Sequence, residues 1–130
     1  MDLTKEEMME VMAVFKEESR EHLSVFETRL KDLDKNLSDP SAIEVLHRTA
    51  HSMKGAARIL GLEPIEQVSM RLESGFKLAK DGALPLQPAH LSLVAEAVAG
   101  LKHLIEKLAN EGTLEGFDIS GVLTKLESFK

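Results

Sequence analysis

Apolar side chains recur at steps of three and four residues through almost the whole chain, and this spacing limits the possible folds more than any other feature of the sequence. A period near 3.6 residues is typical of one face of an α-helix, whereas a half-buried strand alternates apolar and polar residues. No segment of useful length alternates in that way. The chain is therefore predicted to be all-α, without a sheet.

Helix start and stop signals divide the apolar pattern into five segments. Thr4 followed by Glu7 indicates a capping box, and Asp39-Pro40 supplies an N-cap and a first-turn proline. Gly61 is expected to end the second helix, and Asp118 to cap the last one. The predicted helices span residues about 4–36, 40–60, 63–80, 88–110 and 118–129. Four long helices joined by short turns predict an antiparallel four-helix bundle with a short fifth C-terminal helix packed on it.

The length of 130 residues suits one domain, residues 1–130, with a core large enough to need no disulfide. The residues predicted to face this core lie on the apolar stripes of the helices: Val11, Phe15, His22, Phe26, Leu30, Leu33, Leu37, Ile43, Leu46, Ala50, Met53, Ala57, Leu60, Ile65, Val68, Leu72, Ala79, Leu91, Val94, Val98, Leu101, Ile105, Leu108, Ile119, Val122, Leu126 and Phe129. Met8, Met9, Met12, Met53 and Met70 are interpreted as core filler rather than as a binding surface.

Composition and charge argue against several classes of function. The net charge of −6 and the absence of Trp and Tyr are unfavourable for nucleic-acid binding, which uses clustered Lys and Arg and aromatic stacking. No apolar run approaches the roughly 18 residues of a membrane span, and residues 1–7 are too polar and acidic for a signal peptide. The chain also has no cysteine. We expect a soluble cytoplasmic protein without a nucleic-acid or membrane partner.

The second predicted helix carries the most informative side chains. At 100° per residue, His47, His51, Lys54 and Arg58 fall in one band roughly 70–130° from the centre of the apolar stripe. An imidazole at this boundary can turn one nitrogen to a protein partner and keep a free lone pair on the other. Lys54, one turn after His51, can neutralise an incoming phosphoryl group. The small residues 55–57 leave the helix surface low enough for another protein to approach.

Simpler interpretations of the histidines have to be weighed beside this one. A single histidine at a core boundary usually has no function beyond packing, and His22, His90 and His103 are interpreted in that way. His47 and His51, spaced i and i+4, could clamp a metal ion, but two imidazoles are an incomplete site beside a lysine and an arginine. We expect neither a metal nor a cofactor in the domain. A non-catalytic helical scaffold for protein interactions remains the main alternative.

The segment His51-Ser52-Met53-Lys54-Gly55 resembles the His-(Ser/Thr)-x-Lys-Gly motif of histidine phosphotransfer (HPt) domains. The five-helix layout resembles the phosphotransfer domain that begins chemotaxis-type histidine kinases. The resemblance implies that Nε2 of His51 is phosphorylated, that Lys54 supports the phosphoryl group, and that Gly55 is a close-approach glycine. It also implies a glutamate on the next helix that accepts a hydrogen bond from the inner imidazole nitrogen, and Glu73 matches that position.

The sequence departs from the family pattern near this site. A second histidine often supports the site from the third helix, and Met70 occupies that place. His47, one turn before His51, is a candidate to substitute for it in part. Arg58 adds a second cation near the site, and the sequence assigns no role to it.

The resemblance implies partners in a two-component phosphorelay. The ATP-binding domain of a histidine kinase would supply the phosphoryl group, in the same polypeptide or another, and an aspartate of a response-regulator receiver domain would take it. ATP and Mg²⁺ would belong to those partner domains, because this chain contains no Gly-rich phosphate loop or other nucleotide motif. The sequence leaves open whether the 130 residues are a stand-alone phosphocarrier or the leading domain of a larger kinase, which the resemblance favours.

Overall fold

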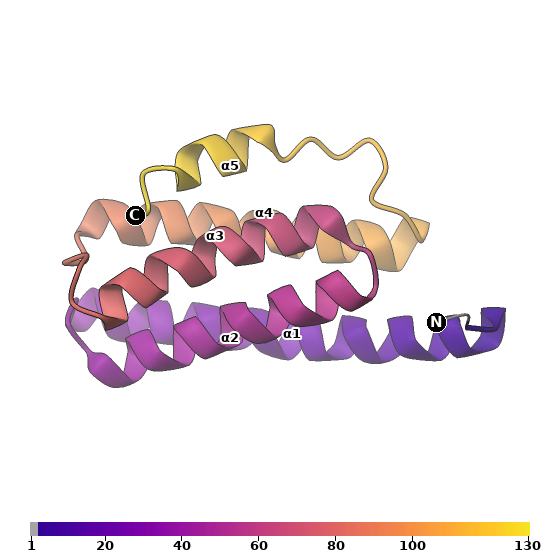
Figure 1. Ribbon diagram of the computed structural model, residues 1–130, viewed down its shortest axis with the longest axis horizontal. Coiled ribbons are helices and arrows are strands. Elements are labelled where there is room, and N and C mark those ends of the chain that lie inside the picture. Colours follow the sequence, from indigo (N-terminus) through magenta and orange to yellow (C-terminus); the bar gives the residue numbers. More distant parts are fainter. Residues whose placement is uncertain (1–2) are drawn as a thin grey trace.

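The computed structural model describes residues 3–130, which form five helices and no strand. The helices are α1 (Lys5–Lys35), α2 (Pro40–Ile59), α3 (Glu63–Lys80), α4 (Pro88–Glu111) and α5 (Ser120–Leu126). Consecutive helices among the first four run antiparallel in a bundle, and α5 packs on α3 and α4 (Figure 1). The predicted all-α class and the bundle architecture are confirmed. Met1 and Asp2, where the polar N-terminal segment begins, lie outside the described residues.

Side-chain caps and glycines determine where the long helices begin and end. The capping box predicted for α1 is present: Thr4 Oγ1 accepts from the Glu7 N–H at 3.0 Å, and Glu7 Oε1 accepts from the Thr4 N–H at 3.2 Å. Asp39 Oδ1 caps α2 by accepting from the N–H groups of the first turn. Gly61 ends α2 at a φ of 69°, a left-handed conformation that costs glycine nothing.

The fifth helix differs from its sequence prediction. Asp118 is not its N-cap, because that position is Ile119, and Asp118 Oδ1 instead accepts from the Ser120 N–H at 2.9 Å in a turn just before the helix. The helix ends at Leu126, yet Phe129 beyond it is only 1% exposed. Phe129 is therefore a core residue of the docked C-terminal segment rather than part of the helix.

The core is continuous through all five helices and contains most of the predicted inward residues. Its largest fully buried side chains include Phe26, Leu46, Met53, Leu72 and Phe76. Complete burial of such a side chain contributes roughly 1.5–3 kcal/mol each. Among the described residues, the backbone of α3 lies close to α2, α4 and α5 but not to α1.

Four residues predicted to be inward are exposed instead. They are Val11 (36% exposed), Met8 (41%), Met9 (66%) and Met70 (41%). Three of them lie in the first turns of α1, which extend beyond the end of the bundle, where no helix covers them (Figure 1). The interpretation of the methionines as core filler is wrong for Met8, Met9 and Met70, whereas Met53 is buried.

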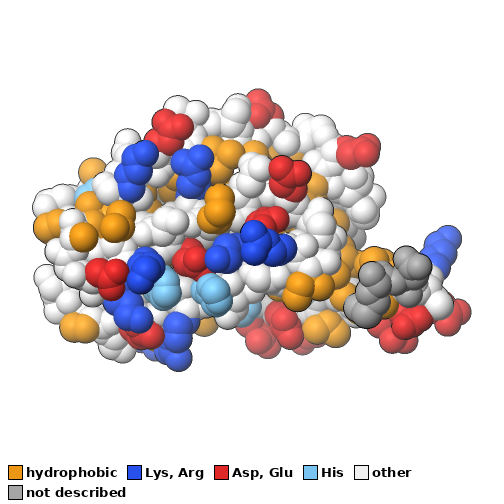
Figure 2. All heavy atoms as spheres, viewed as in Figure 1, with side chains coloured by type: hydrophobic (Ala, Val, Ile, Leu, Met, Phe, Trp, Pro, Cys, Tyr) orange, Lys and Arg blue, Asp and Glu red, His pale blue; other side chains and the backbone are white. Residues whose placement is uncertain are grey.

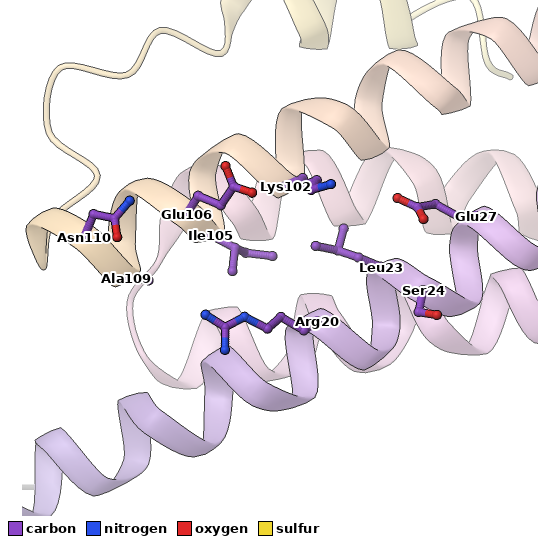
Figure 3. Close-up of a pocket in the computed structure, with 9 residues that line it drawn as sticks. All are labelled: Arg20, Leu23, Ser24, Glu27, Lys102, Ile105, Glu106, Ala109 and Asn110. Atoms are coloured by element: carbon purple, nitrogen blue, oxygen red, sulfur yellow. The ribbon is translucent and has the colours of Figure 1, made fainter.

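A hollow lies between α1 and α4, with a volume of about 320 Å³. Figure 3 shows Arg20 and Glu27 on the α1 wall of the hollow and Lys102 and Glu106 on the α4 wall. None of the residues predicted for the functional site lines it. In the described part of the chain, no helix is long and apolar enough to cross a membrane.

Candidate functional site

The seam between α2 and α3 is bridged by three polar pairs at a regular spacing. Successive pairs lie seven residues apart on each helix, which is two turns, so all three fall on the same edge of the antiparallel hairpin. From one end to the other they are Glu44 with Lys80, His51 with Glu73, and Arg58 with Glu66. The fold therefore brings His51 and Glu73, 22 residues apart in sequence, into contact at the centre of the seam.

The His51–Glu73 contact fixes the state of the imidazole. Nδ1 of His51 lies 2.5 Å from Oε2 of Glu73. An ionised carboxylate can only accept, so Nδ1 carries the proton, and Nε2 of a neutral ring keeps its lone pair. The His51 side chain is 66% exposed, whereas that of Glu73 is 17% exposed. The ring is thus accessible to solvent while the group that orients it is protected.

Lys54 contacts the same carboxylate from the other side. Its Nζ donates to Oε1 of Glu73 at 2.8 Å, and its side chain is 20% exposed. Both oxygens of Glu73 are therefore engaged, one by His51 and one by Lys54. The sequence predicts Lys54 as a partner of the phosphoryl group. The structure shows in addition that Lys54 forms a hydrogen bond with Glu73. An ammonium has three donors, so this bond leaves others available to an incoming anion.

The surroundings of Glu73 favour its charged form. Burial alone raises the pKa of this carboxyl, but the hydrogen bonds from Lys54 and His51, together with their charges, outweigh burial and hold the pKa below its ordinary 4.5. Glu73 is therefore ionised at neutral pH, as the acceptor role requires.

A lowered pKa in the folded state predicts a pH dependence of stability. The contribution of ionised Glu73 is fully present above pH 4.5 and is lost as the pH falls through the lower folded-state pKa. We expect the unfolding free energy, measured with urea at pH 7, 5, 4 and 3, to fall less steeply in acid for Glu73→Gln than for the wild type. Glu106→Gln, an exposed site on α4, should keep the wild-type slope. Equal slopes for all three proteins would contradict this expectation.

The structure does not bring the other two predicted supporting side chains to His51. His47 is half-buried, its Nδ1 is buried without a partner, and within residues 3–130 no hydrogen bond joins it to His51 or Glu73. The structure thus shows no bond through which His47 would take the place of the histidine that Met70 replaces, and that role stays a prediction. Arg58 donates from Nε to Glu66 Oε2 at 2.9 Å. This ion pair links α2 to α3 two turns away from His51.

Gly55 lies open beside the site. A Cβ added to it would meet no atom within 4 Å, so packing inside the chain does not require glycine at this position. Its small size matters only to something that approaches from outside. Ala57 was predicted to share this low surface but is fully buried in the core.

The face that carries His51 combines charge with exposed apolar groups. Figure 2 shows histidine side chains side by side on this face, with Lys and Arg, Asp and Glu, and apolar side chains around them. Ile59 is 80% exposed and lines a shallow hollow with Val14, itself 56% exposed, on α1. Sequence reasoning missed these two residues, although both fall off the apolar stripes of their helices, which is the signal that marks an exposed apolar side chain.

Comparison with known proteins places this geometry in a family. Residues 10–111 match the Hpt domain family. Among the described residues, no cluster of three or more His, Asp or Glu side chains could hold a metal ion.

Similar sequences include chemotaxis protein CheA of Bacillus subtilis, 26% identical over 93% of this chain and 18% of the relative. CheA of Borreliella burgdorferi is 23% identical over 99% of this chain and 15% of the relative. The chain thus spans less than a fifth of the length of these proteins.

A similar solved structure is the phosphorylated P1 domain of CheA3 in complex with CheY6 from R. sphaeroides. The two chains share a TM-score of 0.84 and 23% identity, over 92% of this chain and 94% of the other. This likeness shows the same helical fold. With a family match over most of its length, the chain belongs to the Hpt domain family.

Proposed function

We propose that this chain is a phosphocarrier module in which Nε2 of His51 accepts a phosphoryl group and passes it to an aspartate of a partner. The observation that carries the proposal is the bond from Nδ1 of His51 to Glu73, because it fixes the tautomer whose free lone pair lies on an exposed ring. The membership of the chain in the Hpt domain family supports the same reading.

The forward step can be written with its bonds and charges. The lone pair of Nε2 attacks the terminal phosphorus of ATP held by a kinase domain, an N–P bond forms, and the bond from that phosphorus to the oxygen of the ADP leaving group breaks. The ring retains the proton on Nδ1 and becomes a phosphoimidazolium, whose positive charge faces the Glu73 carboxylate. Lys54 supplies further positive charge one turn away and stabilises the added phosphoryl oxygens.

The second step is the reverse displacement on a different acceptor. A carboxylate oxygen of a receiver-domain aspartate attacks the phosphorus, and the N–P bond breaks to return neutral His51. Mg²⁺ and the acidic residues that bind it belong to the receiver, and ATP belongs to the kinase domain. We infer that both partners act in the cytoplasm, where ATP is supplied. The CheA relatives are more than five times as long as this chain, which supports a module of a larger kinase.

The partner is proposed to meet the face that carries His51, Gly55 and Ile59. The open surface over Gly55 allows close approach, and the exposed apolar side chain of Ile59 offers area that is favourable to bury. The test of the proposed function is incubation of the domain with ATP, Mg²⁺ and a cognate kinase. It should yield acid-labile, alkali-stable phosphate. A folded domain that takes up no phosphate would overturn the proposal, and a non-catalytic scaffold would then be favoured.

The loss of Lys54 is expected to slow phosphorylation without unfolding the bundle. Lys54→Ala removes a charge-assisted hydrogen bond to Glu73 and a cation near the phosphoryl group, so the rate should fall about tenfold, or roughly 1.4 kcal/mol of transition-state stabilisation. The rate of labelling by phosphoramidate, a small donor that needs no kinase, measures this effect. Lys102→Ala on α4 is the matched control and should label at the wild-type rate. An unchanged rate in Lys54→Ala would remove Lys54 from the mechanism.

A larger side chain at Gly55 should slow phosphorylation by a partner kinase and leave the intrinsic reactivity of His51 almost unchanged. Gly55→Leu places atoms in open space and replaces glycine in a helix, so the domain should be more stable by about 0.5–1 kcal/mol in urea unfolding. Kinase-dependent phosphorylation should fall at least about tenfold, because the new side chain obstructs the partner's approach. Labelling by phosphoramidate should fall much less. Equal losses with both donors would mean that residue 55 affects the imidazole rather than docking.

A further inference from the structure

The C-terminal segment docks on a side of α3 that faces away from His51. Phe129 is almost fully buried, although it lies three residues beyond the end of α5. Its ring packs edge-on against Phe76, with centroids 5.1 Å apart and an interplanar angle of 82°, and tilted against His90 at 5.9 Å. His90, which was interpreted from the sequence as a boundary residue, thus contacts the Phe129 ring. The site that Gly75, Phe76 and His90 form around this ring is called the seat of Phe129.

Gly75 forms the floor of that seat. It is buried in the middle of α3, and a Cβ at this position would overlap the ring of Phe129. Glycine in a helix interior costs about 0.5–1 kcal/mol relative to alanine. Unlike Gly55, which has open space above it, Gly75 is required by a contact inside the chain. The backbone of α3 is therefore shaped at residue 75 to admit one aromatic ring.

The seat lies at the level of the functional site. Gly75 follows Glu73 by two residues, so the two positions are about 200° apart around α3 and within 3 Å along its axis. The side chain of Glu73 faces α2, and the ring of Phe129 lies behind the helix. In the described chain the backbone of α3 comes close to α2 in front and to α4 and α5 behind, but not to α1, so its position depends mainly on those three helices.

The reactive geometry is sensitive to small movements of α3. A hydrogen bond weakens steeply once its atoms separate beyond the ordinary range, and a functional group has to be held to within about 0.5 Å. A gap the size of an aromatic ring behind residue 75 would allow α3 to move away from α2. The Glu73 carboxylate would then lose its bond to His51 Nδ1 before the core lost its shape.

We propose that Phe129 is a positioning residue for His51. By filling the seat at Gly75, it holds α3 against α2 and so maintains the bond between Glu73 and His51. The inference rests on the proposed function of His51 and deepens it, because it makes the reactivity of the histidine depend on docking of the C-terminal segment. A seven-residue helix has little stability of its own, so this docking is a local equilibrium that can open without global unfolding.

The experiment uses a compensating pair of substitutions. Phe129→Ala leaves a gap over Gly75, whereas Gly75→Ala overlaps the ring at Cγ, Cδ2 and Cε2. Alanine at residue 129 has none of these atoms, so in the double variant the new methyl group enters the space that they leave. Each single variant should label with phosphoramidate several-fold to about tenfold more slowly. Its His51 ¹⁵N resonances should move from a single Nδ1–H tautomer toward a mixture. The double variant should recover both the rate and the tautomer.

Two comparisons make the outcome decisive. Phe26→Ala is the matched control, because Phe26 is fully buried on α1, whose backbone does not approach that of α3 closely. It should lose stability but keep the wild-type rate and tautomer. The proposal is overturned if Phe129→Ala keeps the wild-type tautomer, or if Phe26→Ala shifts it equally. If either single variant fails to fold, the folded double variant must show the wild-type tautomer. A wild-type domain that takes no label would defeat the proposed function, while the tautomer measurement would still decide this inference.

Discussion

His51→Gln is expected to abolish phosphorylation of the domain. Glutamine has no nitrogen lone pair that can attack phosphorus, and the other four histidines lack the observed combination of an exposed ring with a carboxylate on Nδ1. The phosphate found on the wild-type domain should be labile in acid and stable in alkali, as an N–P bond is, and mass spectrometry of peptides should place it on His51. The side chain is largely exposed, so the substitution should change stability by less than about 0.5 kcal/mol.

The matched control for this variant is His47→Gln, one turn away on the same helix. Because the structure gives His47 no bond to His51 or Glu73, this variant should be labelled at close to the wild-type rate. Residual label in His51→Gln equal to that of the wild type would show that another residue is the acceptor. Loss of label in both variants would show that His47 belongs to the site after all.

Glu73→Gln is expected to cause the second largest loss. The amide keeps nearly the same shape but removes the negative charge, and it can donate as well as accept, so the tautomer of His51 is no longer fixed. Loss of the carboxylate that orients a metal-bound histidine typically costs about 10- to 100-fold, and by analogy we expect a phosphorylation rate lower by about that factor. Labelling by phosphoramidate gives the rate, and the ¹⁵N resonances of His51 give the tautomer.

Glu66→Gln offers a control within the same seam. It alters a carboxylate of α3 seven residues away that pairs with Arg58 rather than with the histidine. The domain should remain folded and retain its labelling rate. If Glu73→Gln labels as fast as Glu66→Gln, the contact with His51 contributes to the structure of the seam and not to the chemistry.

The architecture could be predicted because it depends on local signals that the sequence states directly. The capping box at Thr4, Asp39-Pro40 and the left-handed Gly61 each act within one turn, and the apolar stripes repeat often enough to identify the buried faces. The pairing of His51 with Glu73 was reached by resemblance, with the apolar stripes in agreement. Periodicity supplied the angular position of each residue, but only the antiparallel register determines which residues meet.

The wrong and missing predictions concern features that the spacing of apolar residues does not reveal. The methionines at positions 8 and 9 have the character of core residues, yet α1 is longer than its neighbours and its first turns have nothing to cover them. The contact of Lys54 Nζ with Glu73 was missed, because the angular position of a residue does not show how far its side chain reaches. Gly75 was overlooked because a glycine inside a helix indicates a close neighbour without identifying it, and that neighbour is 54 residues away in sequence.

The spacing of the three pairs across α2 and α3 has a consequence for how an exposed nucleophile can be kept in place. The outer two pairs reach solvent, and water screens them, so their strength is not what matters. Because all three share one spacing, a shift of α3 by one residue in register, which also turns the helix by about 100°, would break them together and turn its apolar stripe out of the core. The alignment of the reactive histidine is thus an all-or-none property of the hairpin, and the ring itself can remain free for a visiting protein.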